Sequence, residues 1–593
     1  MRHKAYHEYL IVFLVYFILT LIFTCPLSMK PGIVFDYIDY LQNIWNFWWI
    51  KKALLRLHTS PYFTSYLFYP QGTKLVFHTL SLYNSVLSIP LQVIFSRPTV
   101  YTILFLSSFV LSGFGTYLLV LYLTRNRFGA FLAGIIYSFS PFHQEHLSEI
   151  NIASIQWIPF FCLYLMKTFW EGKVKDAILC AVFFTLVSLC SWYYALFLVL
   201  FICLFIAYHL ILREKRLWDP KLLKNFGIII LLSAILISPF TYPLIKEALS
   251  DSSYLHVPSF RLAGLLGIRY PEGSLTFWPA ALGYMVTFLS IYFILKIRDK
   301  KTHFWSFMTI FFFILTLGPY LIFLYKAYPQ IPLPMAILQK IPIISAIRYP
   351  YRFMVLVMLG LAVMSGFVCK MFTNSLKGKI ILFFITSLII FEYLSIPLPV
   401  PSSSITIPKI YGIIAADKGD FAIMDVPLNN YCSAFSMYYQ TFHEKKIVGG
   451  YISRTPPSAL EFIHGNQFVR LLLNLTSFRL FKKDKIDLKK DVELLKEKDI
   501  RYIIFHKDFL LRKRPSISLS LWKGLIPYSV SKTKIWPRYT DSKHRGISPK
   551  DAFATEAELQ EFIQFITSIL GRPIFEDKDI VAYKIVKNGK GTI

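Results

Sequence analysis

Long apolar segments recur through the first two thirds of this 593-residue chain, and they constrain its fold more than any other feature. The chain is 55% hydrophobic and 17% aromatic, a composition far more apolar than that of ordinary globular proteins. Because an α-helix needs about 20 apolar residues to cross a bilayer, segments of roughly that length predict transmembrane helices. We expect eleven, over residues 9–28, 99–123, 128–141, 153–169, 177–193, 195–212, 226–245, 279–295, 304–324, 353–370 and 380–396. The chain is therefore predicted to be a polytopic α-helical membrane protein.

Two apolar segments differ from an ordinary internal span, one by its position at the N-terminus and the other by its short length. The first, from Tyr9 to Met29, is long and has no small-residue cleavage site, so it predicts a retained span rather than a signal peptide. The segment from Ser81 to Phe95 is short and contains Pro90. We expect it to lie in or dip into the outer interface of the membrane instead of crossing it.

The distribution of Lys and Arg predicts the orientation. The short loops on one side hold 19 basic residues, and the much longer loops on the other side hold 13. Cytoplasmic loops carry the excess of Lys and Arg, so the N-terminus is predicted to be cytoplasmic and the residues after Pro397 extracytoplasmic. We expect the protein to lie in the plasma (inner) membrane. The net charge of +29 is then explained by basic loops near anionic membrane lipid, and we expect no nucleic-acid partner.

The composition changes near Pro397, where an extended linker from Ile396 to Pro401 follows the last apolar segment. Short apolar segments then alternate with amphipathic ones, which predicts a small α/β domain on the outer face. We expect two domains, a transmembrane domain over 1–396 with a first outer loop at 29–98, and a soluble domain over 397–593. The predicted strands are 421–426, 446–448, 502–505 and 580–586, and the predicted helices are 487–497 and 555–570.

The first outer loop carries acids directly after a membrane span. Asp36 and Asp39 precede three tryptophans at helical spacing, of which Trp45 is the first. Acids at a helix start complement the helix dipole, and tryptophans anchor helices at membrane surfaces. Ionisable residues at a membrane surface are also often functional, so both aspartates are candidate catalytic residues. Trp45 and His78, in the same loop, are candidate substrate-binding residues.

The second outer loop is short and crowded with polar residues. If it is helical, Glu145 and Glu149 share one face, where like charges repel unless a metal ion, a cationic group or substrate hydroxyls lie between them. An ordinary solvated loop is the alternative. Both glutamates are candidate catalytic residues, and His146 is a candidate substrate-binding residue. A divalent cation, Mg or Mn, would suit a set formed by Asp36, Asp39, Glu145 and His146.

The seven cysteines give no further metal signal. Five of them lie within apolar segments, and the chain has no CxxC pair or Cys/His cluster. The sequence therefore indicates neither a disulfide framework nor a zinc site.

Two arginines, Arg348 and Arg352, precede a predicted span on the outer side. An arginine at a span end commonly extends its cation to the interface. The planar guanidinium also donates two parallel hydrogen bonds to phosphate. Because their outer position runs against the positive-inside bias, we predict that they bind the phosphate of a lipid-linked substrate.

These motifs resemble the GT-C superfamily of membrane glycosyltransferases. Its members, such as the oligosaccharyltransferase catalytic subunit and protein O-mannosyltransferases, have a long first outer loop with an acid just after the first span. Segment 127–170 is similar to the oligosaccharyltransferase subunit, and a finer similarity is to prokaryotic members of the superfamily. The matching segments are DYIDYLQNIWNFWW at 36–49, FYPQG at 68–72, His146–Pro159 and Arg348–Phe353.

The resemblance implies an inverting glycosyltransferase that moves a sugar from a polyprenyl-phosphate donor to a glycan, lipid or protein acceptor on the outer face. It implies that Asp36 or Asp39 is the catalytic base or a metal ligand, assisted by Glu145 or Glu149. The chain lacks the WWDYG motif that reads the acceptor in oligosaccharyltransferases, so transfer to asparagine is not expected. The alternative function is a noncatalytic transporter or assembly factor for lipid-linked glycans.

Overall fold

The computed structural model describes residues 2–250, 282–323, 326–341, 344, 347, 349–394, 405–473, 488–511 and 555–585. The chain divides into two compact units. The helical unit comprises Met1–Gly32 and Ser81–Val400, and the sheet unit comprises Ile33–Leu80 and Pro401–Ile593. The expected boundary near 397 lies close to the one at 400, but the sheet unit also includes most of the segment predicted to be the first outer loop of the transmembrane domain.

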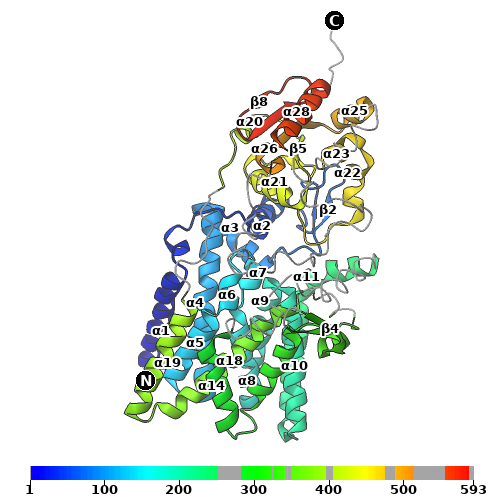
Figure 1. The fold of residues 1–593 in the computed structure, drawn as a ribbon. Helices are drawn as coiled ribbons and strands as arrows, with labels where there is room; N and C mark the ends of the chain where they lie inside the picture. The colour runs from blue at the N-terminus through cyan, green and yellow to red at the C-terminus, as the bar shows by residue number, and fades with distance from the viewer. Residues whose placement is uncertain are drawn as a thin grey trace. The chain divides into compact units, whose positions relative to one another are not determined.

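Each of the eleven predicted spans overlaps a helix, and these helices run side by side in the helical unit (Figure 1). They are α1 (Arg2–Phe23), α4 (Arg97–Thr124), α5 (Arg127–Ser138), α8 (Trp157–Glu171), α9 (Val174–Cys190), α10 (Trp192–Ile211), α11 (Pro220–Ser250), α14 (Tyr284–Lys296), α15 (Phe304–Thr316), α18 (Met354–Phe372) and α19 (Leu376–Tyr393).

Six segments among the described residues are long and apolar enough to cross a membrane. They are Tyr6–Phe23, Arg97–Thr124, Ile150–Glu171, Trp192–Ile211, Pro220–Glu247 and Pro350–Phe372. This confirms a multi-pass membrane protein, whereas the number eleven stays a prediction. Helix α3 (Leu82–Ile94) contains Pro90 and has 13 residues, fewer than the roughly 20 that a span requires.

Helices α4, α5 and α18 form the packed centre of the helical unit. Helix α4 packs against α1, α5 and α8, and α5 packs against α18. Gly129 of α5 lies against α18, where a Cβ atom would come within 2.5 Å of the Gly366 carbonyl oxygen. Small residues at helix contacts allow this close approach, which is a common way for membrane helices to associate.

The predicted span 304–324 is wrong in its second half. Helix α15 ends at Thr316, and the chain then forms a hairpin of β3 (Tyr320–Phe323) and β4 (Lys326–Pro332). Gly318 has a φ of +81° and is followed by Pro319. A glycine in the left-handed region with a proline after it ends a helix, and the apolar composition of this segment concealed that signal.

The sheet unit contains a five-stranded mixed sheet in the order β6-β5-β7-β9-β8. Strand β5 (Ala422–Val426) pairs in parallel with β6 (Lys446–Ile447) and β7 (Ile500–His506), and β9 (Ile580–Lys584) is antiparallel to β7 and to β8 (Phe575–Glu576). The four predicted strands are confirmed. The predicted helices correspond to α25 (Lys489–Glu497) and α28 (Glu556–Leu570).

Helices cover both faces of this sheet. Phe505 of β7 contacts Phe562 of α28, and the next residue, His506, stacks on Tyr439 of α21 (Asn430–His443). Because successive side chains of a strand point to opposite faces, α28 and α21 lie on opposite sides of the sheet. Burial on both faces explains why β5 and β7 are almost continuously apolar.

Residues 33–80 are held within the sheet unit by contacts of their own. Helix α2 (Ile38–Leu55) packs against α21, and the indole Nε1 of Trp45 donates to Gln440 Oε1 at 2.7 Å. The Gln440 amide donates in turn to the Tyr66 carbonyl at 2.7 Å. The hairpin of β1 (Phe63–Thr64) and β2 (Thr73–Lys74) follows α2. Three buried tryptophans thus form part of a protein core, where membrane-interface anchors had been one expectation.

Candidate active site

The predicted site residues fall into two clusters, one in each unit. Asp36 and Asp39 lie at the start of α2 in the sheet unit, and Glu149, His146 and Arg352 come together in the helical unit. Arg348 lies outside the described residues.

Two tyrosines hold the aspartates. The Tyr431 hydroxyl donates to Asp36 Oδ1 at 2.9 Å, and the Tyr451 hydroxyl donates to Asp39 Oδ1 at 3.0 Å. Asp36 is buried, whereas Asp39 in the first turn of α2 keeps partial solvent access. The negative charge of Asp39 is favourable at a helix N-terminus. The two carboxylates are therefore oriented by side chains 395 and 412 residues away in the sequence.

His78 and Trp45 are part of the interior of the sheet unit. The His78 ring accepts from the Ser453 backbone N–H at Nδ1, at 3.2 Å, and its Nε2 lies 3.0 Å from Asn46 Oδ1. Burial lowers the pKa of His78 to about 3, so the ring is neutral and Nε2–H donates. Trp45 is fully buried. Both side chains secure α2 to its surroundings, and the substrate-binding role of these buried residues stays a prediction.

The second cluster is centred on Arg352, in the 3-10 turn η6 (Pro350–Phe353) that leads into α18. Its Nη2 donates to Glu149 Oε1 at 2.6 Å. The guanidinium also lies over the rings of Tyr193 and Tyr349, at 5.0 and 4.7 Å from their centroids. A cation over two aromatic faces and beside one carboxylate is stabilised although only 5% of the arginine is exposed.

This arginine has unused hydrogen-bonding capacity. Arg352 Nε is buried and has no hydrogen-bond partner among the described residues. A buried N–H without an acceptor costs about 1–3 kcal/mol, more when the group is charged. The arrangement therefore favours a further acceptor beside the guanidinium, and an anionic oxygen would be the strongest.

His146 lies beside the same carboxylate. Its Nδ1 donates to the Phe142 carbonyl oxygen at 2.6 Å, and its Nε2 is 3.7 Å from Glu149 Oε2 and 3.5 Å from the Tyr351 hydroxyl. Burial lowers the pKa of His146 below its usual value. The ring is therefore neutral at pH 7, with the lone pair of Nε2 directed toward Glu149 and Tyr351.

Glu145 and Glu149 do not share a helical face, contrary to one expectation. Helix α6 (Pro141–Glu145) ends at Glu145, and α7 (Ile150–Ala153) begins after Glu149. The side chain of Glu145 keeps solvent access, yet the surrounding protein is close enough to raise its pKa to about 7. The break in the helix separates the two charges, and Glu149 pairs with a cationic group.

The residues predicted as metal ligands do not form a metal site within either unit. No group of three His, Cys, Asp or Glu side chains is placed to hold a metal ion in the part of the chain that the structure describes. Asp36 and Asp39 belong to the sheet unit, whereas Glu145 and His146 belong to the helical unit. Neither unit by itself therefore supplies a donor set that fits a divalent cation.

Sequence reasoning missed the aromatic partners of both clusters. Tyr349 and Tyr351 flank Pro350 in the arginine motif, and their alternation with the arginines was a usable signal. Tyr193, Tyr431 and Tyr451 carried no local signal, because each reaches its partner only through the fold.

The fold of this chain is similar to that of a glycosyltransferase of known structure. The solved structure of the arabinofuranosyltransferase AftD from Mycobacteria matches 85% of this chain with a TM-score of 0.53 at 14% identity. The chain covers 35% of AftD. This likeness confirms the resemblance predicted from the sequence, and at this identity it establishes the fold alone.

Two weaker similarities are to oligosaccharyltransferase structures. The oligosaccharyltransferase AglB from Archaeoglobus fulgidus, in complex with an inhibitory peptide and a dolichol-phosphate, matches 87% of this chain and 71% of its own at 10% identity, with a TM-score of 0.45. An oligosaccharyltransferase structure from the same organism with Zn and sulfate matches 86% and 69% at 12% identity, with a TM-score of 0.47. No protein-family model and no curated protein sequence matches the chain.

Proposed function

We propose that this protein is an integral membrane glycosyltransferase that moves a sugar from a polyprenyl-phosphate donor to an acceptor hydroxyl on the outer face of the membrane. The observation that carries the proposal is the buried Arg352, whose Nε lacks a partner among the described residues while its Nη2 holds Glu149. A guanidinium at the start of a span is suitably placed to bind the phosphate of a lipid whose tail enters the bilayer.

The reaction is a single displacement. The acceptor hydroxyl oxygen forms a bond to the anomeric carbon of the sugar, and the bond from that carbon to the phosphate oxygen breaks. The electron pair of the broken bond stays on the lipid phosphate, and the hydroxyl proton passes to a carboxylate base. Attack opposite to the leaving group inverts the configuration at the anomeric carbon.

The named residues then have distinct roles. Asp36 or Asp39 accepts the hydroxyl proton, and Asp39 is the better placed of the two because it keeps partial solvent access. Arg352 neutralises the charge that develops on the leaving phosphate. Glu149 keeps the guanidinium oriented between Tyr193 and Tyr349 until the donor binds.

The experiment is a donor assay with Arg352→Lys. Short-chain polyprenyl phosphates linked to mannose, arabinose, glucose or N-acetylglucosamine serve as probes, and the readout is release of polyprenyl phosphate by purified protein in detergent. Water replaces the unknown acceptor in a slow hydrolysis. Lysine keeps the charge but loses the planar fork, so we expect a lower rate at limiting donor and a higher donor concentration for half-saturation.

Arg125→Lys is the matched control. Arg125 is an exposed arginine at the end of α4, 5.5 Å from the centroid of the Tyr122 ring, and is not in contact with Glu149. The Arg125→Lys variant should show the same dependence of rate on donor concentration as the wild type. Equal donor dependence in the wild type and both lysine variants would contradict a phosphate site at Arg352. No release from any of the four donors by a well-folded wild type would count against the reaction itself.

A further inference from the structure

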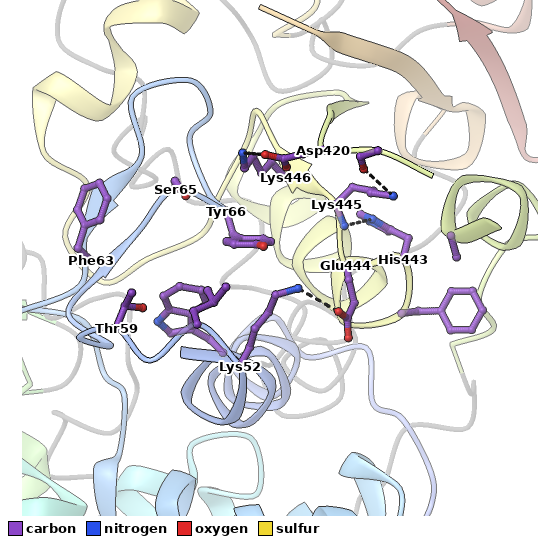
Figure 2. Close-up of a pocket in the computed structure, with 15 residues that line it drawn as sticks. Lys52, Thr59, Phe63, Ser65, Tyr66, Asp420, His443, Glu444, Lys445 and Lys446 are labelled. Carbon is purple, nitrogen blue, oxygen red and sulfur yellow. Dashed lines mark hydrogen bonds and ion pairs between the residues drawn. The ribbon is translucent and has the colours of Figure 1, made fainter. Parts of the chain in front are cut away.

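The sheet unit contains an open pocket that lies apart from the aspartates at the start of α2. Its volume is about 920 Å³, within the range of small-ligand sites. It lies between the C-terminal half of α2, the hairpin after it, and the turn that joins α21 to β6 (Figure 2). Both sequence segments of the sheet unit, 33–80 and 401–593, contribute lining residues, which explains why no local sequence motif marks the pocket.

Aromatic rings form the rim of the pocket. Phe63 is 50% exposed and Phe442 is 49% exposed, and Tyr66 also lines the pocket. Exposed apolar side chains that gather at one concave surface are typical of ligand-binding grooves. A ring that faces solvent beside polar groups suits a sugar, which offers an apolar C–H face and a polar hydroxyl edge.

Charged side chains also line the pocket, and lysines outnumber acids among them. Lys52, whose side chain is 8% exposed, pairs with Glu444 at 3.0 Å. Arg56, which is outside the lining but beside it, pairs with the same carboxylate at 2.7 Å. Lys446 pairs with Asp420 at 2.7 Å. The cation of Lys445 donates to main-chain carbonyls 2.7 and 3.0 Å away, which are neutral acceptors.

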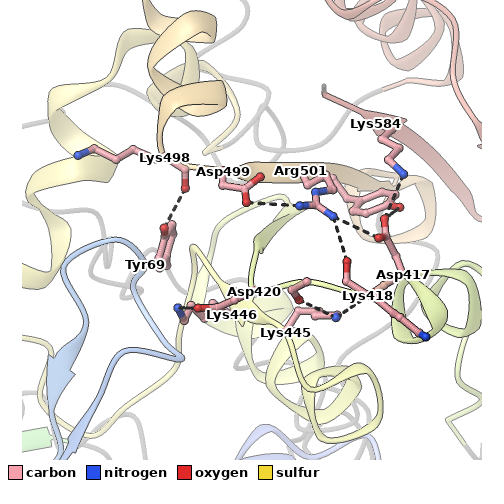
Figure 3. Close-up of polar contacts among 12 residues, drawn as sticks. Tyr69, Asp417, Lys418, Asp420, Lys445, Lys446, Lys498, Asp499, Arg501 and Lys584 are labelled. Carbon is pink, nitrogen blue, oxygen red and sulfur yellow. Dashed lines mark hydrogen bonds and ion pairs between the residues drawn. The ribbon is translucent and has the colours of Figure 1, made fainter. Parts of the chain in front are cut away.

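The positive charge continues beyond the pocket. Arg501 and Lys584 converge on Asp417 at 3.1 and 3.0 Å, next to the carbonyl that binds Lys445 (Figure 3). Across segments 33–80 and 401–593, Lys and Arg number 35 against 22 Asp and Glu. Such an excess attracts anions to the surface of the sheet unit.

We propose that this pocket binds a segment of an acidic glycan, and that this glycan is the acceptor. The aromatic rim would pack against sugar rings, Lys52, Arg56 and Lys445 would attract carboxylates, and Glu444 would accept bonds from hydroxyls. The acceptor role rests on the proposed glycosyltransferase function, whereas the binding does not.

The geometry of α2 sets the length of that acceptor. Asp39 and Lys52 lie at opposite ends of this helix, 13 positions apart, which corresponds to about 20 Å at 1.5 Å per residue. A single sugar cannot reach from the pocket to the proposed base, whereas a chain of several sugars can. The protein would therefore act on a polymer or oligomer in preference to a monosaccharide.

The test is a binding measurement on the full-length protein in detergent, with trigalacturonic acid and maltotriose as acidic and neutral probes of equal length. We expect the acidic probe to bind and its affinity to fall with salt, because charged groups contribute to binding. The double variant F63A/F442A should weaken binding by about tenfold, since it removes two aromatic contacts. Arg56→Gln should weaken it several-fold. Ile574→Ala, which truncates a 48% exposed residue of the same unit outside the pocket, should bind as the wild type does.

The outcomes separate this site from the reaction. Unchanged binding in F63A/F442A and Arg56→Gln, or no binding of the acidic probe, would overturn the site. Equal affinity for maltotriose would overturn its acidic ligand. The binding measurement contains no donor, so it is independent of the donor assay. If the protein binds trigalacturonic acid but releases no lipid phosphate in the donor assay, the binding site stands and the proposed reaction is wrong. If sugar transfer occurs but is unchanged in the pocket variants, the reaction stands and the acceptor role of the pocket is wrong.

Discussion

Replacing Glu149 by Gln should destabilise the helical unit, because it removes the carboxylate that pairs with the buried Arg352. Breaking a buried ion pair by removing one partner costs about 3–5 kcal/mol. The arginine side chain is 7% exposed, but that of Glu149 is 25% exposed, so water offsets part of the loss. We expect a decrease of about 2–3 kcal/mol in the free energy of unfolding.

A double variant tests the origin of this loss. Arg352→Met/Glu149→Gln removes both charges, and it should return to within about 1 kcal/mol of the wild type because no charge is left buried alone. Glu171→Gln is the control, since Glu171 pairs with an exposed lysine and such pairs contribute about 0–1 kcal/mol. The assay is denaturant unfolding of the purified protein in a fixed detergent.

Polyprenyl phosphate gives a second readout from the same variants. If the phosphate binds at the guanidinium, it should stabilise Glu149→Gln more than the wild type, because it supplies the missing negative charge. Two results would refute the ion-pair explanation. One is a Glu149→Gln variant as stable as Glu171→Gln. The other is a double variant whose loss of stability equals the sum of the losses in Glu149→Gln and Arg352→Met alone.

Three other predictions concern the acids and the orientation. Asp36→Asn or Asp39→Asn should lower sugar transfer by about two orders of magnitude, the scale of general-base catalysis, with unfolding unchanged; wild-type rates in both variants would exclude this pair as the base. Because the pKa of Glu145 is raised to about 7, the folded state binds more protons than the unfolded state above about pH 4.5, so stability should fall between pH 5 and 7. Glu145→Gln should lose this part of the pH dependence in thermal unfolding, and parallel curves for the two proteins would contradict the raised pKa. A cysteine introduced at the exposed Ile574 should react with an impermeant maleimide in intact cells, whereas reaction only after permeabilisation would reverse the predicted orientation.

The helices of this protein were predictable because their signal is local. Apolar segments and the Ser, Asn and Gly residues at their ends are sufficient to place a helix. The exception at Gly318 shows the limit of that signal. The residues after it are as apolar as a span, and only the left-handed glycine before Pro319 indicates that the chain turns.

The grouping of residues 33–80 with the sheet unit was not predictable from local patterns. It depends on pairs such as Trp45 with Gln440 and Asp36 with Tyr431, each separated by 395 residues. The same tryptophan spacing suits a helix at a membrane interface and a helix in a protein core. Hydropathy cannot distinguish these two surroundings, since both are apolar on one side.

The Arg352 cluster was partly predictable. The position of the arginine at a span start and the acids in the second outer loop each indicated a special role, and a cationic group beside the glutamates was one of the open alternatives. Their pairing across 203 residues required the fold. The aromatic faces of Tyr193 and Tyr349 required it as well, and they explain how the cation is buried at low cost.

The charge balance of this cluster suits the proposed direction of the reaction. Arg352 and Glu149 cancel, and the neighbouring His146 is neutral because its pKa is lowered. A sugar-linked lipid phosphate carries one negative charge, and a second develops as the bond to the sugar breaks. The Nε–H of Arg352, which has no partner among the described residues, would therefore interact more strongly with the leaving phosphate than with the intact donor, and only such a difference lowers the barrier.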